Sequence, residues 1–141
     1  MANQGSNRAK LELLKGAIDF TTDIFKIILM GNAYAFNPAS AGGYADLSAS
    51  ELITGFGYTA GGLTLAGVTV TQDNALGLGK VVANNVAWTA AGGPIGPASG
   101  AIIYDDTHGS KVVIGYIDFG GGKTAIAAGT FTIANIVIQV V

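Results

Sequence analysis

Short apolar runs separated by glycine-rich stretches dominate the chain after residue 20. In the segment 24–30, Phe25, Ile27 and Leu29 fall on one face of an extended chain, and this spacing is typical of a β-strand. Similar runs recur at about residues 63–71, 80–88, 101–104, 111–119 and 130–140. The pattern predicts an all-β protein and allows a single helical turn near Ser48 to Ile53.

Two of the predicted strands change phase along their length. The apolar positions switch from odd to even numbers across Gly67 and again across Ala134-Asn135. Because a one-residue shift turns the core face of a strand outward, we interpret each switch as a β-bulge. Bulges at bends favour a closed or strongly curved antiparallel β-sandwich.

Residues 1–20 differ from the rest, which predicts an N-terminal arm with a short helix followed by a β-sandwich domain at 21–141. Helix formers fill residues 8–15, and Gly16 gives a stop signal. A two-turn helix is unstable alone and must pack against its own sandwich or a neighbour. Met1 to Asn7 are polar and contain glycine, which indicates a flexible arm.

The first 15 residues hold three of the seven basic residues and several leucines that a two-turn helix cannot bury by itself. We therefore expect this segment to become ordered against a neighbouring subunit or another partner. The candidate interface residues are Arg8, Lys10, Leu11, Leu13, Leu14 and Lys15.

The composition favours a protein that presents surfaces over one that concentrates catalytic groups. The chain has 141 residues, one histidine and no cysteine, and only 11% of its residues are charged. Half of its residues are hydrophobic, so we expect another copy to cover part of the surface, as a homodimer rather than a homotrimer. We expect no enzymatic activity and assign no catalytic residue, cofactor or metal ligand.

Charge and hydropathy limit the other partners. A net charge of −2 argues against nucleic acid, which usually demands a basic face. No apolar stretch approaches the ~20 residues of a membrane-spanning helix, so no membrane partner is expected.

Three motifs suggest chemistry but are better explained as turns. The segment Gly120–Thr124 resembles the end of a phosphate-binding loop, yet the required earlier glycine is Ile117, so we predict a glycine hairpin. The glycines of residues 55–62 are misplaced for dinucleotide binding and predict a turn. The loop 105–110 contains acids, His108 and Ser110, but neighbours on one tight loop do not adopt triad geometry. We expect His108→Ala to leave assembly, and the stability of the assembled particle, unchanged, because a turn position contributes no more than about 0.5 kcal/mol.

The remaining polar and aromatic candidates receive structural interpretations. Asp19, Asp23 and Asp118 are interpreted as surface carboxylates, although the sequence leaves open that they converge. The larger aromatic residues are expected in the sandwich core rather than on a sugar-binding platform. These are Trp88, Tyr104, Tyr116 and Phe119.

An ordered set of segments resembles a family of small structural proteins of tailed bacteriophages. The segments are 10–20, 23–30, 55–62, 100–105 and 117–120. The resemblance implies a virion protein, made in the host cytoplasm, that is similar to capsid cement (decoration) proteins. It further implies a jelly-roll-like antiparallel β-sandwich that binds and stabilises the shell of major capsid protein, and it supplies no catalytic residues.

Three other functions stay open at this point. A tail or neck component belongs to the same structural class. A carbohydrate-binding module on the virion surface requires exposed aromatic side chains flanked by amide and acid groups. A small hydrolase is the least favoured interpretation.

Overall fold

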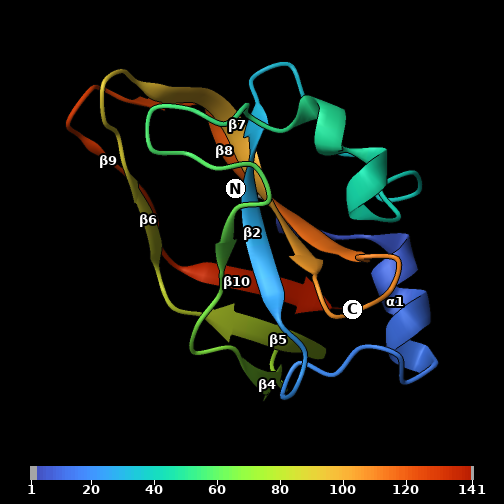
Figure 1. Ribbon diagram of the computed structural model, residues 1–141. Coiled ribbons are helices and arrows are strands. Elements are labelled where there is room, and N and C mark those ends of the chain that lie inside the picture. The colour runs from blue at the N-terminus through green and yellow to red at the C-terminus, as the bar shows by residue number, and fades with distance from the viewer. Residues whose placement is uncertain (1–2, 141) are drawn as a thin grey trace.

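The computed structural model describes residues 3–140 as an antiparallel β-sandwich with one short helix near the N-terminus (Figure 1). This confirms the all-β sandwich expected from the sequence. One layer is a five-stranded sheet in the order β1-β8-β7-β2-β3. Its strands are β1 (Asn3–Gly5), β8 (Val113–Ala125), β7 (Ile95–Asp105), β2 (Phe25–Gly31) and β3 (Leu63–Thr64).

The second layer consists of two hydrogen-bonded groups of strands. The first group has the order β10-β5-β4, and the second pairs β6 with β9. The strands are β4 (Thr69–Asp73), β5 (Leu78–Ala83), β6 (Val86–Thr89), β9 (Thr130–Ile133) and β10 (Ile136–Val140). Helix α1 (Asn7–Leu14) follows β1, and two 3-10 turns, Tyr44–Asp46 and Ser48–Ser50, lie between β2 and β3.

The two groups of the second layer form one ladder with a kink. Ala83 pairs with Ile136, and Val86 pairs with Ile133. Two residues lie between these pairs on each strand, so the register of the pairing is the same on both sides of the kink. At the kink, the Asn135 backbone N–H donates to Asn85 Oδ1 at 3.3 Å. A bulge places unequal numbers of residues opposite each other. The prediction of a bulge at Ala134-Asn135 is therefore wrong, because the two strands have equal numbers of residues here and bend together.

The phase change at Gly67 also has a different cause. β3 pairs with β2 in the first layer, whereas β4 pairs with β5 in the second. The chain crosses between the layers at Gly67, where φ is +64°. The predicted single strand at 63–71 is thus two strands, and the change of phase marks a change of sheet.

Strand β8 continues through the glycine cluster that the sequence predicted as a hairpin. Gly100 pairs with Asp118 and Ala98 pairs with Lys123, so two steps along β7 match five along β8. Positive φ angles at Gly120 and Gly121 accommodate the three extra residues in an irregular bulge. The chain instead turns into β9 at residues 126–129.

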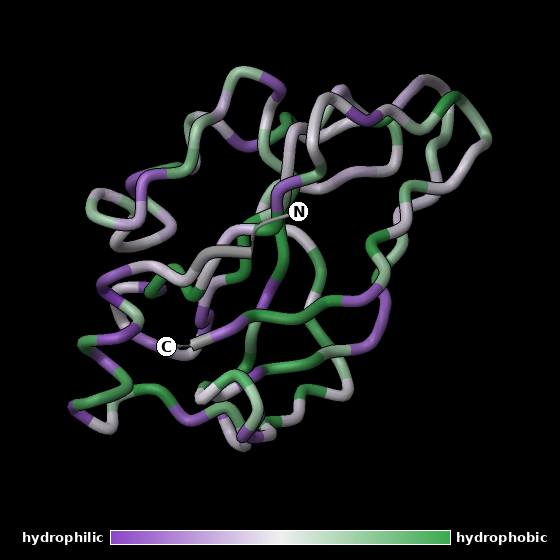
Figure 2. The backbone as a smooth tube through the Cα atoms, turned by 180° about the vertical axis from the view of Figure 1, so that it is seen from behind, coloured by the Kyte–Doolittle hydropathy of each residue, from purple (hydrophilic) through white to green (hydrophobic). Residues whose placement is uncertain are grey.

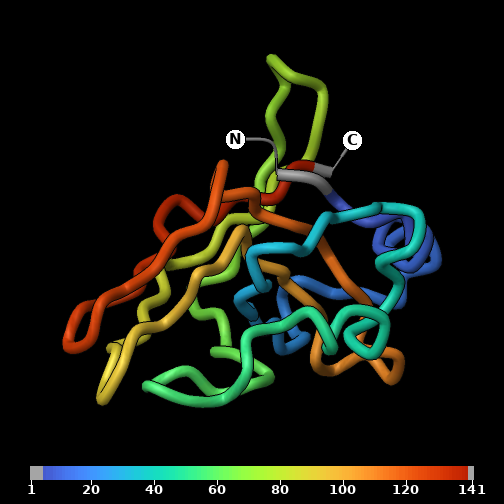
Figure 3. Tube along the Cα trace, turned by 90° about the horizontal axis from the view of Figure 1, so that it is seen from above, coloured from blue at the N-terminus to red at the C-terminus, as the bar shows by residue number. Residues whose placement is uncertain are grey.

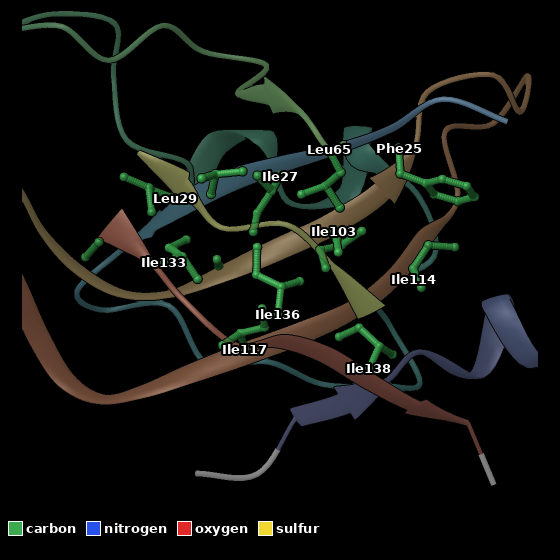
Figure 4. Close-up of a cluster of buried hydrophobic side chains, with 14 of the residues drawn as sticks. Phe25, Ile27, Leu29, Leu65, Ile103, Ile114, Ile117, Ile133, Ile136 and Ile138 are labelled. Carbon is green, nitrogen blue, oxygen red and sulfur yellow. The ribbon is translucent and has the colours of Figure 1, made fainter. Parts of the chain in front are cut away.

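Apolar side chains fill the space between the layers. Phe25, Ile27 and Leu29 of β2 point into this space, as predicted, and meet isoleucines of β7, β8, β9 and β10 (Figure 4). When the backbone is coloured by the hydropathy of each residue, hydrophobic stretches run along the strands in the middle of the molecule (Figure 2). Burial of these side chains is the main favourable contribution to folding.

The other face of the five-stranded sheet is also covered. Ile28 and Met30 of β2 pack with Tyr104 of β7 and with Ala41 and Leu47 of the segment 32–62. Because both faces of β2 are buried, its residues are apolar at nearly every position rather than alternating.

The glycine before β3 sits too close to β2 to carry a side chain. A Cβ at Gly62, where φ is +76°, meets the Ile27 carbonyl oxygen at 1.9 Å, whereas a Cβ at Gly61, where φ is +94°, meets nothing within 4 Å. We expect Gly62→Ala to lower the melting temperature far more than Gly61→Ala, which pays only about 1–2 kcal/mol of left-handed strain. Thermal unfolding followed by circular dichroism measures both. Equal losses contradict the close approach.

Candidate functional site

The N-terminal segment packs against its own sandwich. Gly5 pairs with Gly115 of β8, and the Ser6 backbone N–H donates to the Ile114 carbonyl at 3.0 Å. The Ser6 hydroxyl caps α1 by accepting the Ala9 N–H at 3.0 Å, and it donates to the Val113 carbonyl. The prediction of a flexible arm is therefore wrong for residues 3–7. The cause is long-range pairing with β8, which local propensity does not reveal. Met1 and Ala2 lie outside the described residues.

Helix α1 contributes a buried acid to this attachment. Glu12 is almost fully buried and forms ion pairs with Arg8 at 2.7 Å and with Lys15 at 3.4 Å. The hydrogen bond from Arg8 is the largest of several influences that lower the pKa of Glu12. His108 Nε2 from the loop after β7 lies 3.7 Å from the same carboxylate. The cluster joins α1 to a loop that is distant in the sequence.

The candidate interface residues divide into two groups. Arg8 and Lys15 gather around Glu12, while Leu13 packs against the core. Leu11 is 51% exposed and Leu14 is 89% exposed. Lys10 is also exposed.

The expectation that residues 3–14 need a partner to become ordered is wrong, because their own chain buries Ser6, Ala9 and Glu12. The domain boundary at residue 20 stays a prediction.

The loop after β7 forms a hydrogen-bonded turn, as its sequence predicted. Asp105 Oδ1 accepts the backbone N–H groups of Thr107 at 2.9 Å and His108 at 3.1 Å. His108 Nδ1 accepts the Ser110 backbone N–H at 3.1 Å. The side chain of His108 therefore links the turn to α1 through Glu12, a contact that the sequence did not indicate.

Two carboxyl groups meet beneath this turn. Asp105 is fully buried, and its Oδ2 has no hydrogen-bond partner among the described residues. Burial, followed by the neighbouring carboxyl of Asp23, raises the pKa of Asp105 to about 6. Asp23 also accepts the Asp19 backbone N–H at 2.9 Å. Asp118 lies on β8 opposite Gly100, and its carboxylate accepts the Gly120 N–H.

A third buried acid, Glu51, organises the segment 32–62. The Glu51 carboxylate accepts hydrogen bonds from the hydroxyls of Tyr44 and Tyr58 and, at 2.8 Å, from the Gly61 N–H. The Tyr58 hydroxyl in turn accepts the Leu29 N–H of β2 at 3.0 Å. Burial and the nearby Glu51 carboxylate raise the pKa values of Tyr44 and Tyr58. Sequence analysis missed this centre, because one glutamate among loop residues carries no signal of its partners.

Two of the four aromatic residues lie in the sandwich core, as expected: Trp88 is buried there and Phe119 packs partly buried against it. Tyr104 and Tyr116 are also buried, but in the second cluster on the outer face of the five-stranded sheet. Phe119 and Phe131, with ring centroids 5.8 Å apart, line an open groove of about 390 Å³ between β8 and β9. Lys123 also lines this groove.

Three loops meet at the end of the sandwich opposite α1 (Figures 1 and 3). We define this loop end as residues 52–58, 90–96 and 126–129. The Ala91 N–H donates to the Phe56 carbonyl at 3.0 Å, and the Ala128 N–H donates to the Ala90 carbonyl at 2.9 Å. These backbone hydrogen bonds tie the three loops together.

The loop end presents large apolar side chains to solvent. Ile53 is 88% exposed, Ile126 is 76% exposed and Phe56 is 53% exposed. Beside them lies a pocket of about 210 Å³, lined by residues 52–56, 58 and 94–96. Sequence analysis missed this surface because its members come from three separate turns.

Comparisons with models of known families, with curated proteins and with solved structures gave no match. The resemblance to tailed-bacteriophage structural proteins therefore stays a prediction. Within residues 3–140, no helix is long and apolar enough to cross a membrane. Over the same range, no three His, Asp or Glu side chains are grouped as metal ligands.

The raised pKa of Asp105 predicts an unusual pH dependence of stability. The folded chain holds a proton on Asp105 that the unfolded chain releases between about pH 4 and pH 6, so this group destabilises the fold as pH rises through that range. We expect Asp105→Asn to raise the melting temperature at pH 7 and to differ little from the parent at pH 4. Thermal melts across pH 4–8 measure the difference.

The adjacent residue supplies a control of opposite sign. Asp106 pairs with Lys111 and with Lys26, and the hydrogen bond from Lys111 is the largest influence lowering its pKa. Its stabilisation is present above its ordinary pKa and is lost as pH falls through the lowered value. Asp106→Asn should therefore lower the melting temperature at pH 7. A loss of stability in Asp105→Asn at pH 7 refutes the buried acid pair.

Proposed function

We propose that this protein is a structural component of a tailed-bacteriophage virion, and specifically a capsid cement protein that binds the shell of major capsid protein. The resemblance found in the sequence supports this function. The observation that carries it is the exposure of Leu11 and Leu14 on a helix whose opposite side is fixed to the sandwich. These two side chains, with Lys10, form the shell-binding face.

The energetics of such a face suit a cement protein. Burying an exposed leucine fully contributes roughly 1.5–3 kcal/mol. Because β1 and Ser6 already hold α1 against β8, binding does not have to order the helix, and less of this energy is lost to entropy. A contact of this size is weak alone, and it gains avidity where copies of this chain are joined to one another on the shell.

The proposal is tested by co-sedimentation with shells of major capsid protein assembled from the same phage. The double variant Leu11→Ser/Leu14→Ser removes the apolar part of the face without touching buried residues. Leu76→Ser is the matched control, because Leu76 is 64% exposed at the turn between β4 and β5. We expect the double variant to lose at least ten-fold in shell affinity and the control to bind like the parent.

Two results contradict the proposal. One is that the parent protein does not sediment with the shells at any concentration tested. The other is that the double variant binds as tightly as the control. Melting curves of all three proteins establish that any loss of binding is not a loss of folding.

A further inference from the structure

We propose that the loop end is a self-association surface that takes the loop end of a second copy of this chain, with Ile126 of each copy entering the pocket of the other. This surface is separate from the face on α1, so the inference does not depend on the proposed function. Four features of the loop end support it: its charge, its shape, its backbone strain and its size.

The first feature is the absence of charge. None of the three segments that form the loop end contains an Asp, Glu, Lys or Arg residue. In a two-fold symmetric contact the same patch lies on both sides, so charges of one sign face each other near the axis. An uncharged apolar patch avoids this repulsion. It also offers no basic side chain to attract an anionic partner.

The second feature is a projecting side chain beside a pocket that fits it. Ile126 follows Ala125, which pairs with Ile95, and Ile95 lines the pocket. The projection and the pocket are therefore neighbours on one patch. An apolar cavity of about 150 Å³ holds a benzene molecule. The pocket of about 210 Å³ therefore accepts the side chain of an isoleucine.

The third feature is backbone strain at two exposed residues of the loop end. Phe56 and Ala128 have left-handed backbones, with φ of +56° and +67°. This conformation costs a residue with a Cβ about 1–2 kcal/mol, and glycine adopts it freely. Phe56 nevertheless occupies its position half exposed, with its ring against Gly93. Strain of this kind collects at functional sites.

The fourth feature is the size of the patch, which sets the expected affinity. Ile53, Phe56 and Ile126 together expose on the order of 400 Å² per copy, and two copies bury about twice that. This total lies below the ~1,200 Å² at which stable interfaces begin. The dimer should therefore be weak, with a dissociation constant on the order of micromolar to millimolar.

The first experiment measures self-association of the full chain by sedimentation velocity over a dilution series from millimolar to micromolar. We expect the parent to pass from dimer to monomer within this range. Ile126→Ser should raise the dissociation constant at least ten-fold, because it removes the projecting side chain. Leu76→Ser is the control, since it removes an equally exposed apolar residue elsewhere and should dimerise like the parent.

The second experiment locates the contact through disulfides, which is possible because the chain has no cysteine. Ile126→Cys and Ile53→Cys proteins are mixed under mild oxidation, and mixed dimers are identified after proteolysis by the mass of the disulfide-linked peptides. We expect this pair to cross-link at least ten-fold faster than a mixture of Leu76→Cys with Ile53→Cys. Melting curves establish that each variant is folded.

Three outcomes overturn the inference. The first is a parent that stays monomeric at millimolar concentration. The second is an Ile126→Ser protein that dimerises like the parent, or equal cross-linking in the two mixtures. The third is a monomeric parent that sediments with phosphatidylcholine vesicles and loses this binding in Ile126→Ser, which assigns the loop end to a lipid surface instead.

Discussion

The buried carboxylate of Glu51 is the interaction on which the outer half of the molecule depends. The segment 32–62 contains no strand apart from isolated bridges, so its backbone groups cannot be satisfied by a sheet ladder. Backbone hydrogen bonds within local turns satisfy many of these groups, and Glu51 ties the turns together by accepting the hydroxyls of Tyr44 and Tyr58 and the Gly61 N–H. A carboxylate removed from water in this way is tolerated only because its oxygens accept several hydrogen bonds.

The same centre fixes the position of more distant parts. Tyr58 connects Glu51 to the backbone of β2, and the Tyr104 hydroxyl of β7 donates to the Gly61 carbonyl at 2.8 Å. The loop that carries Ile53 and Phe56 lies between these anchors. The buried outer face of the five-stranded sheet and the geometry of the loop end therefore have a common origin in one acid.

The sequence predicts the strands well because their signal is local. Alternation of apolar residues identifies the inner face of β2, and the same logic detects the changes of phase at Gly67 and at Ala134-Asn135. Periodicity does not reveal which sheet a strand joins, so a crossing between layers and a symmetric kink both resemble bulges. At Gly120 and Gly121, residues that permit a turn instead permit an irregular bulge, and only the pairing of β8 with β7 decides between the two.

The candidate site was less predictable because its contacts join distant parts of the chain. The basic residues and leucines of the N-terminal segment suggested an interface, yet the buried Glu12 decides which of them remain available. It pairs with Arg8 and Lys15 and lies 3.7 Å from His108, a residue almost a hundred positions away, while Leu11 and Leu14 stay exposed. Ile53, Phe56 and Ile126 belong to separate turns, so only the assembled fold makes them one surface.

Charge is distributed unevenly over the sandwich, and this asymmetry separates the two proposed contacts physically. Around α1 and the start of β2, the ionised side chains of Glu12, Asp106 and their basic partners are close together. Binding through that end should weaken with salt wherever Lys10 contributes, because exposed charges are screened over about 10 Å at 0.1 M. The loop end has no ionised group to screen, and apolar association strengthens in salts excluded from protein surfaces.

A two-fold contact at the loop end also directs the two α1 faces away from each other. Under the proposed function, such a pair would bridge separate sites on a shell, and each weak contact would raise the effective concentration of the other.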